Sequence, residues 1–139
     1  MRHKGSGGFT LVELLTAMGL AGILMAIVVP QFMSLLPTIY LSSAARQVAA
    51  DLQLARTRAI SQNIQYAVAF TPGTGAYTFG ADLRDLNQLF PGTQITAVAP
   101  ANPTFNPVGT ATANTTITVS NGGATRQVQI NTMGRVRVP

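Results

Sequence analysis

Residues 9–29 read FTLVELLTAMGLAGILMAIVV, and this stretch decides how the rest of the chain is organised. As a helix it would be about 31 Å long at ~1.5 Å per residue, which matches the thickness of the hydrocarbon core of a bilayer. No charged residue occurs between Glu13 and Arg46. The segment therefore predicts a membrane helix with two features that need an explanation, Glu13 near its start and Pro30 just after its end.

Three interpretations of this helix compete. A secretory signal peptide would use Arg2 and Lys4 as its positive end, but the apolar stretch is too long and no small-x-small cleavage site precedes a polar start. A plain membrane anchor, with Arg2 and Lys4 on the cytoplasmic side, leaves Glu13 unexplained. A carboxylate inside an apolar helix costs about 2.5–3.5 kcal/mol on insertion scales, so Glu13 is a candidate functional residue.

The third interpretation rests on residues 8–13, which read GFTLVE. They resemble the processing site of type IV prepilins and type II secretion pseudopilins. The resemblance implies that residues 1–8 are a leader, that a prepilin peptidase cuts between Gly8 and Phe9, and that the new N-terminus at Phe9 is methylated.

Processing would also explain Glu13. Cleavage creates a cationic α-amine on Phe9, and a buried carboxylate is tolerated when a cation pairs with it. The resemblance implies that this cation is the Phe9 amine of a neighbouring subunit, which sets the register as subunits stack. The alternative is that Glu13 only interacts with the helix dipole at the N-terminus.

Gly22 and Pro30 weaken the same helix. Proline is the more severe of the two, because it removes a hydrogen-bond donor and clashes with the preceding turn. The resemblance implies that the segment between such a glycine and proline melts and extends in assembled pili. A merely kinked membrane helix is the open alternative.

After Pro30 the helical pattern continues and then changes to strands. Apolar residues recur at steps of three and four, which predicts an amphipathic helix to about Asn63 with Asp51 off its apolar stripe. The stripe consists of Leu41, Ala45, Val48, Leu52, Ala55 and Ala59. A period of two then predicts strands at residues 64–70, 76–79, 94–98, 115–120, 127–131 and 134–138, the last at an edge.

Two segments between the strands are less regular. Residues 82–90 fit either a short helix or a loop, and residues 99–109 carry three prolines and are expected to form an irregular connection. The fold predicted is α+β and pilin-like, a long N-terminal membrane-spanning helix packed on a C-terminal antiparallel β-sheet domain, because a sheet needs a cover for one face. The expected parts are a leader (1–8), a transmembrane and filament-core helix (9–29), its amphipathic continuation (30–63) and a β-rich globular domain (64–139).

Within the pilin superfamily, the stretch DLQLARTRAI at residues 51–60 resembles the FimT/GspH branch. That branch also has a Phe-x-Pro-x-Gly segment, here Phe105, Pro107 and Gly109, and a late Gly-Arg; residues 82–103 match nothing in it. The resemblance implies a minor pilin of a type IV pilus or a minor pseudopilin of a type II secretion system. The implied partners are other pilin or pseudopilin subunits, the prepilin peptidase and the inner membrane. The globular domain is then expected in the periplasm, and the assembled protein in an envelope or surface filament.

The charges are few and unevenly placed. Charged residues make up 9% of the chain, against roughly 25% in soluble domains, and the formal net charge is +5. No acidic residue follows Asp85, whereas Arg126, Arg135 and Arg137 do. An acid-free half with arginines predicts an anionic partner, because the guanidinium group bonds two phosphate oxygens at once.

The sequence Gly134-Arg135-Val136-Arg137 is the sharpest feature of this half. In a strand the two arginines share a face about 6.6 Å apart at ~3.3 Å per residue, which suits successive phosphates. The pattern resembles the Gly-Arg-x-Arg tail associated with DNA capture in FimT-type pilins of naturally transformable bacteria. DNA binding would then be weak, backbone-directed and sequence-independent, with Arg126 as a third contact. The alternative is an edge strand whose charges prevent aggregation.

Enzymatic and metal chemistry find little support in the composition. The chain has no cysteine, and its single histidine, His3, lies in the expected leader. Disulfides, thiol catalysis and Cys-ligated zinc are therefore excluded, and we expect no enzyme activity, no catalytic residue, no metal and no cofactor.

Overall fold

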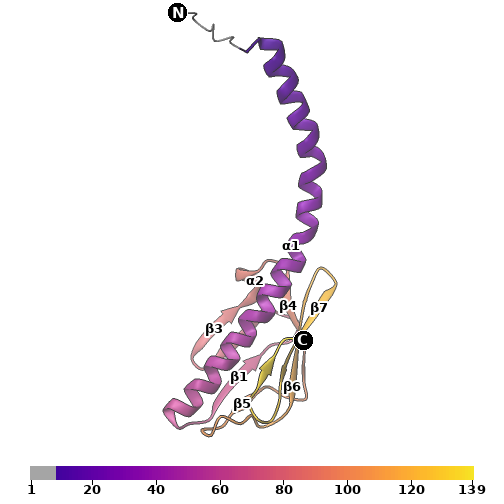
Figure 1. The fold of residues 1–139 in the computed structure, drawn as a ribbon. Coiled ribbons are helices and arrows are strands. Elements are labelled where there is room, and N and C mark those ends of the chain that lie inside the picture. Colours follow the sequence, from indigo (N-terminus) through magenta and orange to yellow (C-terminus); the bar gives the residue numbers. More distant parts are fainter. Residues whose placement is uncertain (1–8) are drawn as a thin grey trace, which may run out of the picture. The chain divides into compact units, whose positions relative to one another are not determined.

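The computed structural model describes residues 9–139, which divide into two compact units with a boundary between Leu35 and Leu36 (Figure 1). One helix, α1 (Leu11–Gln62), contributes to both units. Its end agrees with the predicted end at about residue 63. Asn63 has a φ of 54°, and the Ile64 N–H donates to the Ala59 carbonyl at 3.2 Å, so a left-handed residue closes the last turn.

The first unit consists of the N-terminal part of α1, which buries none of its large apolar side chains. Each of these side chains in residues 9–35 is at least 51% exposed. By length and composition, α1 is the one helix among residues 9–139 that could cross a membrane. This segment therefore needs lipid or other protein to cover it.

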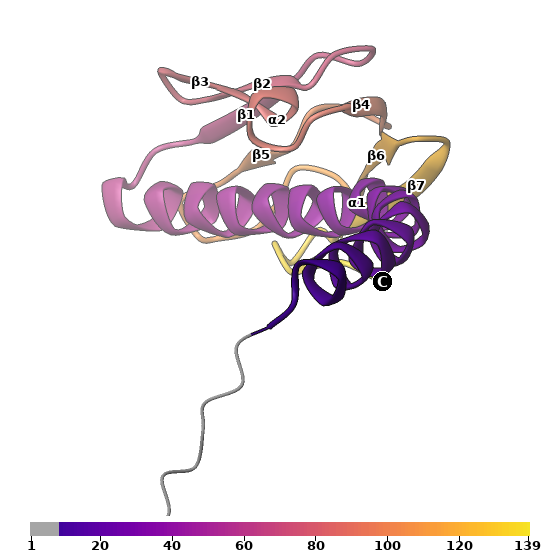
Figure 2. The same ribbon diagram turned by 90° about the horizontal axis from the view of Figure 1, so that it is seen from above.

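The second unit begins with the C-terminal part of α1, whose inner face is buried. All six residues of the predicted stripe are buried, and so are Ala44 and Asp51. Four of these eight buried residues are alanine. In Figure 2 this part of α1, in magenta, runs along one side of the strands.

The strands form two antiparallel sheets of four. One has the order β3-β2-β1-β5 and the other the order β4-β6-β7-β8. In chain order they are β1 (Tyr66–Phe70), β2 (Ala76–Phe79), β3 (Asp82–Asp85), β4 (Thr93–Ala99), β5 (Thr104–Phe105), β6 (Thr115–Asn121), β7 (Ala124–Ile130) and β8 (Val136–Arg137). A single core joins α1 to both sheets. The predicted fold class is confirmed. The sequence did not predict that the strands divide into two sheets.

Three segments differ in detail from the expectation. Residues 82–90 form strand β3 and a one-turn helix, α2 (Leu86–Leu89), because β3 pairs with β2 and the Asp85 carboxylate accepts the Asn87 N–H at 2.8 Å. The connection at residues 99–109 contains β5, which pairs with β1 and whose Phe105 also forms a bridge to Ala111. The last strand, β8, is shorter than residues 134–138.

Asp51 is buried in this core, although the sequence pattern left it off the apolar stripe. It lies three residues after Val48 and four before Ala55, so it projects toward the sheet. The Tyr77 hydroxyl donates to its Oδ2 at 2.5 Å, and the Arg84 Nε lies 3.5 Å from the same oxygen. Burial and the bond to Asp51 raise the pKa of Tyr77 far above its ordinary value, so the phenol stays a donor.

A second junction ties two loops to α1. The Arg56 Nε donates to the Gly109 carbonyl at 2.8 Å. Gly134 lies against the same carbonyl with a φ of 73°, and a Cβ on it would collide with that oxygen and come within 2.9 Å of the Arg56 Nε. Glycine is therefore required at position 134, which explains one element of the late Gly-Arg pattern.

We expect Gly134→Ala to destabilise the domain by about 3 kcal/mol, because it combines left-handed strain with a collision against backbone. Gly123→Ala is the matched control, since Gly123 has a φ of 86° but a Cβ added to it would meet no atom within 4 Å. It should cost about 1 kcal/mol, the strain alone. Denaturant unfolding followed by the near-ultraviolet signal of the tyrosines measures both values. If both variants lowered the free energy of unfolding equally, the collision at position 134 would be contradicted.

Candidate functional site

The N-terminus of α1 presents the first candidate residue, Glu13. The Thr10 Oγ1 accepts the Glu13 N–H at 3.2 Å, so Thr10 caps the helix and Glu13 occupies its third position. The Glu13 side chain is exposed, and no cation of residues 9–139 forms an ion pair with it. Phe9 is 84% exposed, whereas Gly8 and the rest of the expected leader lie outside the described residues.

Gly22 and Pro30 lie within an uninterrupted helix. The helical assignment of α1 continues through both residues. Pro30 has no N–H to donate, so the Ala26 carbonyl lacks its usual intrahelical partner. Melting between these two residues in a filament therefore stays a prediction.

The second candidate site lies where β7 turns into β8. The Asn131 N–H donates to the Arg135 carbonyl at 3.1 Å, and the Gly134 N–H donates to the Asn131 carbonyl at 2.8 Å. These bonds close a three-residue turn with a left-handed glycine, a common way to connect antiparallel strands. The turn sets the register of β8, in which Arg137 lies opposite Gln129 and Val136 opposite Ile130.

This register puts the two arginines on one side of the sheet. Val136 and Val138 are partly buried against the core, whereas Arg135 and Arg137 are exposed on the outer face. Successive side chains of a strand alternate between faces, so the valines fix the direction of the arginines. The structure thus brings Arg135 and Arg137 together as the sequence predicted, although Arg135 precedes the two residues of β8 itself.

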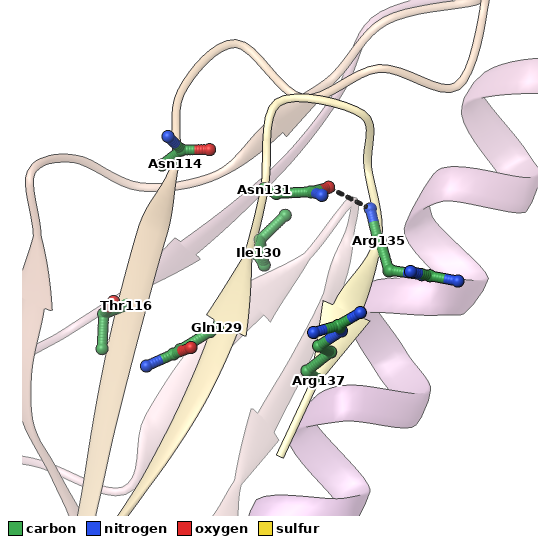
Figure 3. A pocket seen from close by; sticks show the side chains of 7 residues that line it. All are labelled: Asn114, Thr116, Gln129, Ile130, Asn131, Arg135 and Arg137. Atoms are coloured by element: carbon green, nitrogen blue, oxygen red, sulfur yellow. Dashed lines mark hydrogen bonds between the residues drawn. The ribbon is translucent and has the colours of Figure 1, made fainter. Parts of the chain in front are cut away.

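A hollow of about 460 Å³ lies beside these arginines. Seven residues line it, and all but one are polar (Figure 3). They are Asn114, Thr116, Gln129, Ile130, Asn131, Arg135 and Arg137. Thr116 lies opposite Gln129 and Gln129 lies opposite Arg137, so three neighbouring strands supply the floor. The hollow is therefore a feature of the folded sheet.

Arg126, the expected third contact, does not lie on the face of the sheet that carries Arg137. Arg126 lies opposite the buried Val119 and shares its face of β7 with Val128 and Ile130. Gln129, which neighbours Arg137, is on the other face. The alternation of side chains along β7 therefore puts Arg126 on the opposite face from Gln129, and Arg126 does not line the hollow.

Three other arginines are held within the domain. Arg56 bonds the Gly109 carbonyl, and Arg84 pairs with Asp51. The guanidinium of Arg58 lies 4.7 Å from the centre of the Phe79 ring and donates to a tyrosine hydroxyl. Because these contacts use their charges internally, the exposed positive charge of the second sheet comes from its own arginines, and no acidic residue belongs to its strands.

Sequence reasoning missed Asn114 and Asn131 as members of the site. The pattern Asn131-Thr-Met-Gly134 is a turn signal that could have drawn attention to Asn131. Asn114 lies far away in sequence and reaches the hollow only through sheet pairing. Within residues 9–139, the His, Cys, Asp and Glu side chains form no group of three able to hold a metal ion.

Comparisons with known proteins agree with this geometry. Residues 44–134 match the family described as "Type II transport protein GspH", and residues 3–29 match the "Prokaryotic N-terminal methylation motif". The "Pilin-like protein PilA1" of Thermus thermophilus is 30% identical over 154 residues, covering 94% of this chain and 97% of that protein.

Two solved structures share the fold. The type IV minor pilin FimU of Pseudomonas aeruginosa has a TM-score of 0.57 at 20% identity, covering 71% of this chain and 92% of FimU. The minor pseudopilin EpsH of the Vibrio cholerae type 2 secretion system has a TM-score of 0.58 at 16% identity, covering 71% of this chain and 95% of EpsH. With its methylation motif and its apolar N-terminal helix, the chain belongs to the GspH family, as a minor pilin or pseudopilin of the type IV pilus or type II secretion type.

Proposed function

We propose that the chain is a minor pilin of a type IV pilus that binds DNA and takes part in DNA uptake. The observation that carries the proposal is the hollow with Arg135 and Arg137 on the acid-free second sheet. Exposed guanidinium groups without acidic neighbours attract phosphates, and binding through phosphates does not depend on sequence. The site holds only two charges, Arg135 and Arg137, so the expected affinity is modest.

Assembly into the filament rests on the other end of the chain. The apolar side chains of residues 9–35 need a cover, which the inner membrane supplies before assembly and neighbouring subunits supply afterwards. Glu13 has no cationic partner among residues 9–139, so its charge calls for one from outside the chain. After a prepilin peptidase cuts between Gly8 and Phe9, the methylated amine of a neighbouring Phe9 provides that partner.

The precursor is oriented by its own charges. Arg2 and Lys4 precede the apolar helix and favour a cytoplasmic N-terminus, which directs the globular domain to the periplasm. In the filament the segment from Gly22 to Pro30 is the part of α1 most easily extended, since Pro30 already deprives the helix of one hydrogen bond.

The second candidate function is that of a minor pseudopilin in a type II secretion system. The match of residues 44–134 to the GspH family and the likeness to a secretion pseudopilin favour it. An exported protein would then be the partner, and the arginines would only protect the sheet edge. DNA binding discriminates between the two candidates.

Processing gives the first test. Mass spectrometry of filament-associated protein should find a methylated Phe9 at the N-terminus. Gly8→Leu should leave the precursor uncut, because a bulky side chain blocks the position before the cleaved bond. Gly5→Leu, which alters the leader at a distance from that bond, is the control. A mature pool that begins at Met1 would contradict the proposal.

Glu13 gives the second test. Glu13→Val should still insert in the membrane, because it removes a charge from an apolar helix. It should enter filaments poorly or without methylation, as seen by sheared-filament blots and mass spectrometry. Thr16→Val, one turn further along α1, removes a polar group without a charge and should assemble normally. Normal incorporation and methylation of Glu13→Val would exclude the pairing.

DNA binding gives the third test. Replacing Arg135 and Arg137 with Gln should weaken binding on every sequence alike. The slope of log affinity against log salt should flatten by about 1.4 for a single strand and about 1.8 for a duplex, at ~0.7 and ~0.9 per phosphate. A fluorescence titration of the full chain in uncharged detergent at several salt concentrations measures this slope.

Arg126→Gln is the charge-matched control, because Arg126 lies on the other face of β7. It removes one charge, as Arg135→Gln and Arg137→Gln each do, and should change the slope less than either of those single variants. The fold should survive in all variants, since exposed charges contribute little to stability. If the wild type does not bind at low salt, or if the double variant binds equally well, the secretion pseudopilin becomes the leading candidate.

A further inference from the structure

The hollow offers hydrogen-bond donors besides the two guanidinium groups. The Asn114 Oδ1 accepts the Thr132 N–H at 2.8 Å, and the Asn131 Oδ1 accepts the Arg135 N–H at 2.8 Å. A backbone N–H can bond only the oxygen of a side-chain amide, so these bonds fix the orientation of both amides. The NH2 of each asparagine takes no part in these bonds and can only donate, while its Oδ1 keeps one further lone pair.

The charge around the hollow also favours a ligand that accepts hydrogen bonds. No acidic residue occurs in residues 86–139, so no carboxylate of this sheet competes for the donors. Thr116 and Gln129, on the floor of the hollow, can each donate as well as accept. Two guanidinium groups, two NH2 groups and a polar floor match a ligand with one negative charge and several acceptor oxygens, which describes a phosphodiester.

We propose that the hollow binds a phosphodiester of a nucleic-acid strand, and that Asn114 and Asn131 donate to its oxygens beside Arg135 and Arg137. This proposal rests on the DNA-binding function above and adds two uncharged contacts to it. The volume of about 460 Å³ far exceeds the ~30 Å³ of a water molecule, which leaves room for the sugar attached to the phosphate. A strand also presents consecutive phosphates, which suits two arginines separated by a single residue.

The variants Asn114→Asp and Asn131→Asp isolate these contacts. Each keeps the oxygen that accepts the backbone N–H, so the turn keeps its hydrogen bonds, and each replaces the NH2 with an oxygen that repels phosphate. Gln127→Glu is the matched control, because it adds one negative charge, as each Asn→Asp change does. Gln127 lies on the same face of β7 as Gln129 but does not line the hollow. Thermal unfolding of every variant checks the fold.

Binding is measured by fluorescence anisotropy with a labelled single-stranded oligonucleotide and the full chain in uncharged detergent at low salt. We expect each Asn→Asp variant to weaken binding about tenfold more than Gln127→Glu, as expected for a lost hydrogen bond to a charged group. An oligonucleotide with a neutral methylphosphonate backbone should not bind the wild type. Glycerophosphoglycerol, the headgroup of an anionic lipid, should not displace the strand at an equal phosphate concentration.

The outcomes separate this proposal from the function on which it rests. No binding by the wild type would reject DNA binding altogether. Binding that is lost in the double arginine variant but equals the Gln127→Glu control in both asparagine variants would overturn this proposal alone. Equal binding of the methylphosphonate strand would show that bases rather than phosphates are held. Displacement by the lipid headgroup would assign the hollow to a membrane surface.

Discussion

The packing of one face of α1 against both sheets is the contact on which the rest of the domain depends. Half of the buried residues on this face are alanines such as Ala44 and Ala55, and buried residues of α1 and of both sheets form one core. Neither sheet has another long helix among residues 9–139 to cover it. The helix therefore acts as the common support on which two short antiparallel sheets are held together.

Contacts with α1 also determine the geometry of the surface that carries Arg135 and Arg137. Arg56 on α1 bonds the Gly109 carbonyl, and Gly134 packs against that carbonyl. This junction holds the turn before β8, and the turn determines which side of the sheet Arg135 and Arg137 face. A contact on the inner side of the domain thus positions charges on its outer side. The Phe-x-Pro-x-Gly and late Gly-Arg segments, separate in sequence, meet here.

The two parts of α1 differ in whether the chain itself covers their apolar side chains and pairs their charges. Its C-terminal part satisfies its apolar face within the chain, and even the buried Asp51 obtains a hydrogen bond from Tyr77 on β2 and an ion pair with Arg84 on β3. Its N-terminal part satisfies neither its apolar side chains nor the Glu13 carboxylate within residues 9–139. A helix in this condition needs lipid or other protein to cover it, which agrees with the membership in the GspH family.

The sequence by itself determined the local elements. Periods of 3.6 and 2 predicted the end of α1, the bounds of β2 and the hairpin of β6 and β7, because the alternation between buried and exposed positions is encoded by neighbouring residues. The GFTLVE stretch indicated the family, and the arginines at positions 135 and 137 indicated the candidate surface. The short strands β3 and β5 were missed, since each forms through pairing with other segments and has no clear alternation of its own.

Tertiary structure alone decided which residues share a surface. The face of Arg126 follows from the register of β7 against β6, and the membership of Asn114 in the hollow follows from pairing between strands. Asp51 is buried because Tyr77 and Arg84, about 30 positions away, supply its partners. Such contacts join residues distant in sequence, and local periodicity carries no information on which distant residues will meet.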